Sequence, residues 1–326
     1  MEEAKKEHFD LVAIGEILVA MLEIGKNEQG NSIFAANPGE GPGGVAAAAA
    51  RLGARSAYIA KVGNDPLGQS LYEMLRWSGV DVSHVTFDPD EPTTLALIPS
   101  EESGGQSAYV RCPGADVRIS EAELSRDLIE SASVFHFGSE SLYDEPARSA
   151  TLSAVRIARE AGVLVSFAPG CRVSQCKKPE TELETIRNAI RLCDILSVKN
   201  EEMEQLTGTS NLEEGSAKLL AEGPFLVMIT MGNNGVFYRK GECTGYQPVV
   251  KRVENYYTGA ISETFLGAFL TRLIETGAPR EVKKETLDDI LGFAIAAGAL
   301  TASRPGTIRA MPQREEVRRS LQDLQN

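Results

Sequence analysis

The 326-residue sequence is poor in positive charge, and this shortage limits what it can bind. It has 33 Lys and Arg residues against 46 Asp and Glu, so the formal net charge is −13 and the pI is near 4.9. Nucleic-acid backbones and anionic membrane surfaces are bound through clustered positive charge. We therefore expect no nucleic-acid partner and no membrane-surface partner.

Long apolar runs are also missing from the sequence. No stretch approaches the roughly 18 residues that a membrane-spanning helix requires, and the charged start Met1–Lys6 is unlike a signal peptide. The sequence thus predicts no membrane segment and a cytoplasmic location.

Cysteine is scarce, and its spacing matches no common disulfide or zinc pattern. The five cysteines are an odd number without a CxxC pair, in a chain long enough to fold without disulfides. We interpret them as free thiols. Cys171 and Cys176 are close enough in sequence to form a redox pair or share a metal ion, but no histidine or second cysteine pair completes a zinc site.

The pattern of apolar segments indicates an α/β fold. A buried strand is expected at Leu11–Val19, interrupted by Gly15 and Glu16, and two long helices are expected at Ile261–Glu275 and Lys284–Ala302. Between them, strands and helices alternate, which predicts a mostly parallel sheet covered by helices on both faces. The alternating strands are expected at 134–138, 163–167, 195–198 and 225–230, and the helices at 145–161, 179–193 and 212–221.

A second, smaller sheet is predicted from short alternating segments. Thr93–Ile98 and Ser107–Arg111 flank a Glu-Glu-Ser-Gly-Gly turn and predict a hairpin, which Ser32–Ala36 could join. The glycine-rich stretch 39–44 then leads into a helix near Val45–Leu52. Its spacing and its proline do not match the G-x-G-x-x-G dinucleotide motif.

The segment Tyr256–Phe269 is the strongest candidate for chemistry, because a turn of small residues leads directly into an apolar helix. The first N–H groups of such a helix lack helical partners and attract anions. Glu263 lies in this first turn. The same residues also describe an ordinary buried helix, with Ser262 as its cap and Glu263 balancing the helix dipole.

Taken together, the segments resemble the ribokinase-like (PfkB) sugar kinases, most closely the fructokinase branch. The resemblance implies one three-layer α/β/α domain over 1–326, with a small β-sheet lid at about 17–38 and 92–112. It also implies a sugar or sugar derivative as ligand, ATP and Mg²⁺ if the protein is active, and a homodimer formed through the lid. It rests on Gly15-Glu16 and on residues 50–54, 61–68, 93–96, 111–116, 135–139, 201–208, 230–232 and 265–269.

In that family a sugar hydroxyl attacks the γ-phosphate of ATP, and the protein supplies a base, an anion hole and a positioned metal. The segment near residue 260 is similar to the family motif D-T-x-G-A-G-D. The resemblance places Glu263 at the catalytic Asp, and Ala260, Ile261 and Ser262 at the anion hole, while Tyr257 replaces the first Asp. Glutamate is one methylene longer than aspartate, and side chains hinder the close backbone approach that glycine permits.

The sugar-binding positions of the family also differ here. Ala20 and Ala168 replace acidic residues, and Gly44 replaces an Asn. Arg111 and Arg172 could hold a phosphate or carboxylate, or lie in surface ion pairs. The positions that the resemblance assigns to substrate binding are Gly15, Ala20, Gly43, Gly44, Arg111 and Arg172.

The nucleotide-binding positions are preserved in part, and Ile295 stands where the family normally has an Asn beside the adenine pocket. Glu202 matches the acidic residue of the family's metal-linked N-x-x-E pattern and is expected to act on the metal indirectly, whereas Lys199 replaces the Asn. That lysine could supply positive charge or be a solvated helix start. Glycines of a β-turn need no nucleotide to explain them. The nucleotide-binding positions are Lys199, Thr230, Gly232, Gly235 and Ile295.

Three hypotheses follow from these matches and departures. The first is a pseudokinase, a fructokinase-like protein with weak or no phosphotransfer and a binding, scaffold or regulatory role, with or without a cofactor. The second is an active ATP-dependent sugar kinase that uses Glu263 as its base on a changed acceptor. The third is a cleft used for another ligand or reaction, for which Tyr256, Tyr257 and Cys171 are candidates, although the two tyrosines could simply pack on the terminal helices.

Overall fold

A nine-stranded sheet forms the centre of the protein. The computed structural model describes residues 8–39, 41–100, 108–110, 113–170, 179–249 and 259–323. The strand order is β13-β12-β11-β10-β9-β8-β1-β4-β5, and the strands from β11 to β5 are parallel, whereas β12 and β13 add an antiparallel edge. The strands are β1 (Phe9–Ile14), β4 (Ser56–Gly63), β5 (Val85–Asp88), β8 (Ala132–Gly138), β9 (Leu164–Ala168), β10 (Ile195–Lys199), β11 (Leu226–Thr230), β12 (Val236–Lys240) and β13 (Cys243–Gln247).

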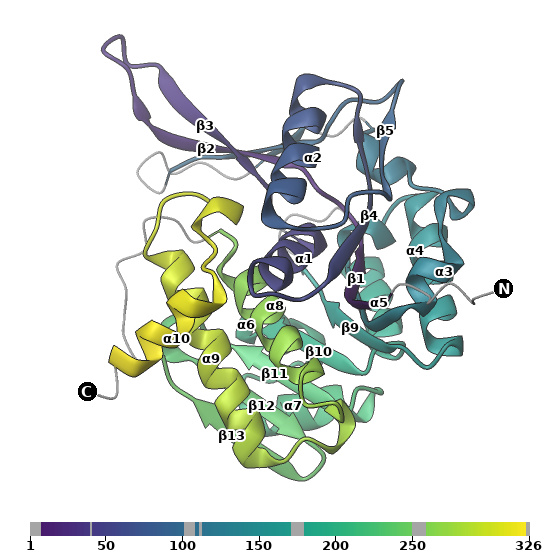
Figure 1. The fold of residues 1–326 in the computed structure, drawn as a ribbon, viewed down its shortest axis with the longest axis vertical. Coiled ribbons are helices and arrows are strands. Elements are labelled where there is room, and N and C mark those ends of the chain that lie inside the picture. Colours follow the sequence, from purple (N-terminus) through teal and green to yellow (C-terminus); the bar gives the residue numbers. More distant parts are fainter. Residues whose placement is uncertain are drawn as a thin grey trace, which may run out of the picture.

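Helices cover both faces of this sheet (Figure 1). One face packs against α3 (Arg126–Glu130), α4 (Ala147–Glu160), α5 (Pro179–Ile190), α6 (Asn200–Thr207) and α7 (Leu212–Ala221). The other packs against α1 (Pro42–Arg51), α2 (Pro66–Ser78), α8 (Ile261–Ile274), α9 (Lys284–Ala302) and α10 (Arg314–Asp323). Short 3₁₀ turns are η2 (Ala115–Arg118), η3 (Glu121–Glu123), η4 (Glu140–Leu142), η5 (Gly232–Asn234), η6 (Pro279–Glu281) and η7 (Ile308–Ala310).

The central strands are apolar on both sides because helices bury both faces. In β1, Val12 and Ile14 belong to the core under α4, while Leu11 packs with α8 and α9 on the opposite face. Successive strand residues point to opposite faces, so this continuous apolar segment fills two core layers at once. The predicted three-layer α/β fold with a mostly parallel sheet is confirmed.

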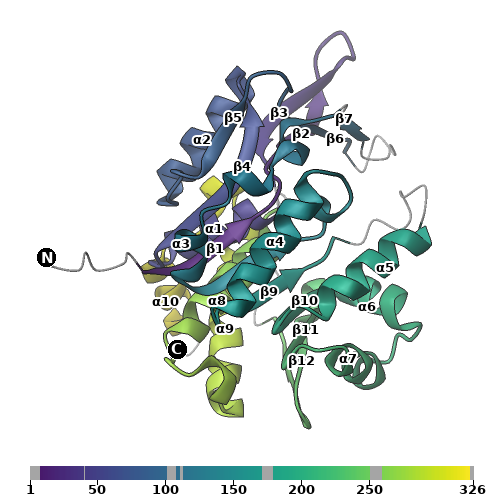
Figure 2. The ribbon, with the colours of Figure 1, turned by 90° about the vertical axis from the view of Figure 1, so that its right-hand side faces the viewer.

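A small separate sheet, with strand order β3-β2-β6-β7, stands apart from the main sheet in both views (Figure 1 and Figure 2). Its strands are β2 (Val19–Lys26), β3 (Ser32–Pro38), β6 (Leu95–Ile98) and β7 (Ala108–Val110). The β2–β3 and β6–β7 pairs are antiparallel, and β2 and β6 run parallel. The hairpin predicted from alternation in this region is therefore present.

The prediction of one strand over Leu11–Val19 is wrong. The chain leaves the main sheet after Ile14 and enters the small sheet at Val19, so the apolar segment belongs to two strands of different sheets. Gly15 permits this change, because its φ is +151° and a Cβ there would lie 2.9 Å from Pro42 Cγ. Within the described ranges, no helix is long and apolar enough to cross a membrane.

Candidate functional site

A cavity of about 230 Å³ opens where five parallel strands end. Glu16 follows β1, Ser139 follows β8, and Ala168, Lys199 and Thr230 end β9, β10 and β11; all five line the cavity. The starts of α1 and α8 border it as well. Open parallel sheets bind ligands at this edge, outside the carboxyl ends of their strands. We refer to this space as the first cavity.

The start of α8 has a strained backbone. Ala260, immediately before the helix, has φ +62°, the one left-handed conformation of a non-glycine residue in the described part of the chain. Its carbonyl oxygen accepts hydrogen bonds from the N–H and the hydroxyl of Thr264, at 2.9 and 2.6 Å. The backbone N–H groups of Ile261, Ser262 and Glu263 therefore come before the first hydrogen bond of the helix. Both an anion hole and an ordinary helix start would show this arrangement.

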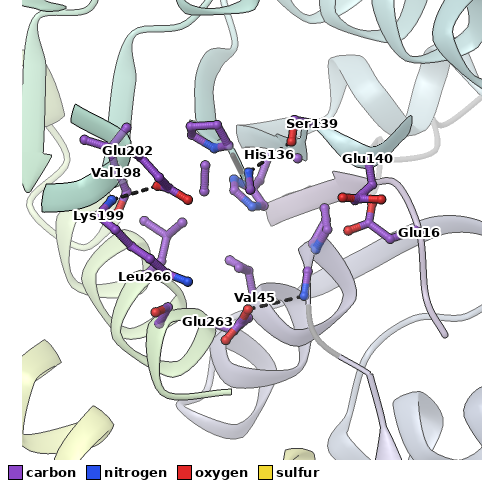
Figure 3. Close-up of a pocket in the computed structure, with 18 of the residues that line it drawn as sticks. Glu16, Val45, His136, Ser139, Glu140, Val198, Lys199, Glu202, Glu263 and Leu266 are labelled. Carbon is purple, nitrogen blue, oxygen red and sulfur yellow. Dashed lines mark hydrogen bonds between the residues drawn. The ribbon is translucent and has the colours of Figure 1, made fainter. Parts of the chain in front are cut away.

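The carboxylate of Glu263 points from this helix start toward α1 (Figure 3). One of its oxygens accepts a hydrogen bond of 3.3 Å from the backbone N–H of Gly41. A Cβ placed on Gly44 would lie 2.9 Å from Cγ and 3.1 Å from Cβ of Glu263. The longer acidic side chain thus fills space that is open because residue 44 is a glycine.

The wall of the first cavity that faces the small sheet is apolar. Leu18 precedes β2, Ala20 belongs to it, and Ala96 and Ile98 belong to the neighbouring β6. Their side chains pack together with Leu22 under the small sheet, and Ala20 is only 2% exposed. Within the described residues, this wall offers no side-chain hydrogen-bond partner to a ligand.

Another part of the lining is polar. Glu16, His136, Ser139 and Glu140 line it, with the imidazole of His136 buried and its Nδ1 3.1 Å from the hydroxyl of Ser166. Burial lowers the pKa of His136 to about 3, so its ring is neutral at physiological pH. Sequence reasoning did not single out His136 or Glu140 as site residues, although their positions at the carboxyl end of β8 are a signal for this location.

A second cavity, of about 560 Å³, adjoins the first. The loop after β11 and the helices α8 and α9 enclose it, with Phe265 and Val249 among its apolar residues. Every residue that the sequence assigned to nucleotide binding lines this space, together with Ile261 and Ser262: Lys199, Thr230, Gly232, Gly235 and Ile295. The backbone alone also explains a glycine at position 235, because its φ is +88° and a Cβ there would lie 2.1 Å from the carbonyl oxygen of Gln247.

Lys199, Thr230 and Ser262 line both cavities and so lie where the two adjoin, a place that we call the passage. Lys199 precedes α6, and its backbone N–H donates a 2.8 Å hydrogen bond to Oε2 of Glu202. Glu202 therefore caps this helix while lining the first cavity.

Other predicted residues lie near the site without lining either cavity. Gly15 packs against Pro42, and a Cβ on Gly43 would lie 3.1 Å from the ring of Tyr58. The hydroxyl of Tyr58 donates to the carbonyl oxygen of Glu16, and burial raises its pKa well above the usual value. Several candidates lie outside the described residues: Arg111, Arg172, Tyr256, Tyr257, Cys171 and Cys176.

The described residues contain no group of three or more His, Cys, Asp or Glu side chains placed to share a metal ion. Glu202 and Glu263 are carboxylates in the first cavity wall near the passage. Magnesium in kinases is bound through one or two carboxylates together with nucleotide phosphates and water. These residues fit a magnesium ion that arrives with a nucleotide, rather than one held by protein ligands alone.

Comparison with known proteins places the chain among sugar kinases. The profile described as pfkB family carbohydrate kinase matches residues 9–314. Fructokinase-1 of Oryza sativa subsp. japonica is 35% identical over 311 residues, which cover 94% of this chain and 96% of the relative.

Two solved structures agree with this placement. The Vibrio cholerae O395 fructokinase, bound to fructose, ADP and a calcium ion, superposes with a TM-score of 0.84 at 26% identity, covering 97% of this chain and 100% of that one. The aminoimidazole riboside kinase of Salmonella enterica, complexed with aminoimidazole riboside and an ATP analogue, has a TM-score of 0.82 at 26% identity and covers 96% and 100%. The chain belongs to the pfkB family of carbohydrate kinases and is similar to its fructokinases.

Proposed function

We propose that this protein is a fructokinase-like pseudokinase that binds a nucleotide but phosphorylates fructose slowly or not at all. Its role would then be binding, scaffolding or regulation. The observation that carries the proposal is the apolar wall of the first cavity, formed by Leu18, Ala20, Ala96 and Ile98. A sugar that enters this cavity loses water from its hydroxyls on that side without gaining hydrogen bonds in return.

Ala20 is the central residue of this wall. The family resemblance implies an Asp at this position that holds sugar hydroxyls, and the buried methyl group of Ala20 offers no acceptor. Selectivity for a hydroxyl depends on buried polar groups that need that partner. Ala168, at the end of β9, lines the same cavity with a second methyl group in place of an acidic side chain.

The position of the base supports the same proposal. Glu263 is one methylene longer than the family's Asp, and Gly41 engages one of its carboxylate oxygens. Displacing a catalytic group by about 1 Å can slow a reaction on the order of a hundredfold. Ala260, Ile261 and Ser262 also add side chains to the helix start that would face the transferred phosphate.

For the second cavity, we propose ATP with Mg²⁺ as the ligand. Thr230 and the loop Gly232–Gly235 would hold the phosphates, and Ile295 would flank the adenine ring. Glu202 would act on the metal indirectly, through water. Bound magnesium would neutralise the phosphate charge, as it does in phosphoryl transfer generally.

A second candidate function is an active kinase for a different acceptor. The fit of Glu263 over Gly44 favours it, because the altered base has defined space and a hydrogen-bond partner. In this case the acceptor would present its reactive hydroxyl to Glu263 and a less polar side to Ala20 and Ala96.

ATP consumption measured against a panel of ketoses, aldoses and nucleosides separates the two candidates. The pseudokinase proposal predicts no acceptor with an ordinary kinase rate, about 1–100 per second. Such a rate with any acceptor would favour the active enzyme, and Glu263→Gln should then abolish it. A Glu263→Gln protein that keeps its rate would show that Glu263 is not the base.

We also propose a homodimer formed through the small sheet. Ile24 on β2 and Ile33 and Phe34 on the edge strand β3 are exposed apolar side chains. Exposed apolar groups at a sheet edge favour association. Sedimentation should show a dimer that Phe34→Glu dissociates, whereas Leu152→Glu, at an exposed apolar residue on α4, should leave it intact. A monomeric wild-type protein would contradict this proposal.

A further inference from the structure

Lys199 is the one positively charged residue among those lining either cavity in the described structure. It ends β10, lines both cavities, and is exposed. Its side chain extends from the strand end toward the start of α8, beside Leu266 (Figure 3). A terminal phosphate of a nucleotide in the second cavity would have to approach this same passage to reach the first.

The ammonium group of Lys199 is available for a ligand. Among the residues that the structure describes, it takes part in no ion pair, and its helix-capping contact with Glu202 uses the backbone N–H only. Glu202 and Glu263 line the first cavity as well, so acidic side chains share this part of the site with Lys199. A phosphate entering this region requires positive charge close by.

The start of α8 carries side chains where a phosphate would approach its backbone. Anion binding at a helix start depends on close approach to backbone N–H groups, and Ile261 and Ser262 place side chains there. A lysine has a long, flexible stem and three donors, so it can reach a phosphate that the backbone cannot approach closely.

We propose that the ammonium of Lys199 binds the terminal phosphate of ATP at the passage between the two cavities. The inference rests on the nucleotide-binding part of the proposed function, and it is independent of whether phosphate is then transferred. Through this contact, Lys199 would make the site prefer nucleoside triphosphates over monophosphates.

A lysine at a helix start can also be a solvated residue without a ligand, and the chain contains a matched example. Lys283 immediately precedes α9, as Lys199 precedes α6, and it is exposed. It lines neither cavity. Any general effect of removing a charge before a helix should therefore appear equally in Lys283 variants.

The test is calorimetric titration of the full chain with ATP, ADP and AMP, without metal and with Mg²⁺. Lys199→Met should weaken ATP binding at least about tenfold and change AMP binding less than about twofold, since a charged hydrogen bond to the last phosphate is lost. Lys199→Arg should keep ATP affinity within about threefold of wild type, and Lys283→Met should match wild type.

Three results would overturn the proposal: an equal loss for ATP and AMP, no loss in Lys199→Met, or no nucleotide binding by the wild-type protein. Rapid phosphorylation of fructose would contradict the proposed pseudokinase but would leave the Lys199 result unaffected, because the titration measures binding and not turnover.

Discussion

Glu263 lies directly over Gly44, so that a Cβ on this glycine would come within 2.9 Å of the Glu263 Cγ. The two residues belong to α8 and α1, at positions where the sequence resemblance implies an Asp and an Asn. The lost side chain at residue 44 and the added methylene at residue 263 are complementary in space. Gly44 and Glu263 therefore form one local arrangement.

This arrangement predicts energetic coupling between the two positions. Gly44→Ala should destabilise the protein by about 1–3 kcal/mol through overpacking. In a Glu263→Ala background the cost should fall by at least about 0.5 kcal/mol, because the nearest contact is removed. Urea unfolding of the double-mutant cycle measures both values. Gly292→Ala, in α9 with no atom within 4 Å of the added Cβ, is the control and should be neutral or stabilising. Additive effects would contradict the coupling.

Ala260 holds a backbone conformation that suits glycine. A left-handed conformation costs an L-residue roughly 1–2 kcal/mol of folding free energy. A glycine in its place costs roughly 0.4–1 kcal/mol, because it raises the conformational entropy of the unfolded chain. Ala260→Gly should therefore stabilise the fold by about 0.5–1 kcal/mol in chemical unfolding. Ala217→Gly, at an exposed position inside α7, should instead destabilise it by about 1 kcal/mol. Destabilisation by Ala260→Gly would show that the strain is absent.

The buried His136 should make the stability of the fold depend on pH. Burial lowers its pKa to about 3 in the folded protein, against about 6.5 for an unfolded chain. Between these values the unfolded chain binds a proton that the folded one does not, so stability falls as the pH drops from 6.5 toward 3. The contribution approaches 1.4 kcal/mol per pH unit.

His136→Gln should remove this part of the pH dependence in unfolding measurements between pH 6.5 and 4. An unchanged slope in His136→Gln would mean that the buried imidazole is protonated in the folded state.

The sequence was most informative where neighbouring residues determine the structure. Apolar periodicity placed α9 at Lys284–Ala302 and α8 from Ile261, because both helices bury most of their surface. The family resemblance grouped Thr230, Gly232 and Gly235, and the structure places all three along the second cavity. Local pattern could not divide Leu11–Val19 between two sheets, because the apolar run continues from the end of β1 to the start of β2.

Contacts between distant segments could not be predicted in the same way. The contact of Gly44 with Glu263 depends on how α1 packs beside α8, and the placement of Glu140 in the first cavity depends on where β8 lies in the sheet order. From the sequence, Gly44 indicated a lost sugar contact, whereas Glu263 left both a pseudokinase and an active kinase open. The structure adds the complementarity between them.

The rate of fructose phosphorylation tests the central claim most directly. It can be followed by ³¹P NMR with ATP, Mg²⁺ and saturating fructose, for wild type and for the reverted protein Ala20→Asp/Gly44→Asn/Glu263→Asp. We predict a wild-type rate at least about a hundredfold below the 1–100 per second of ordinary kinases, and a higher rate in the reverted protein. A wild-type rate within the ordinary range would contradict the account.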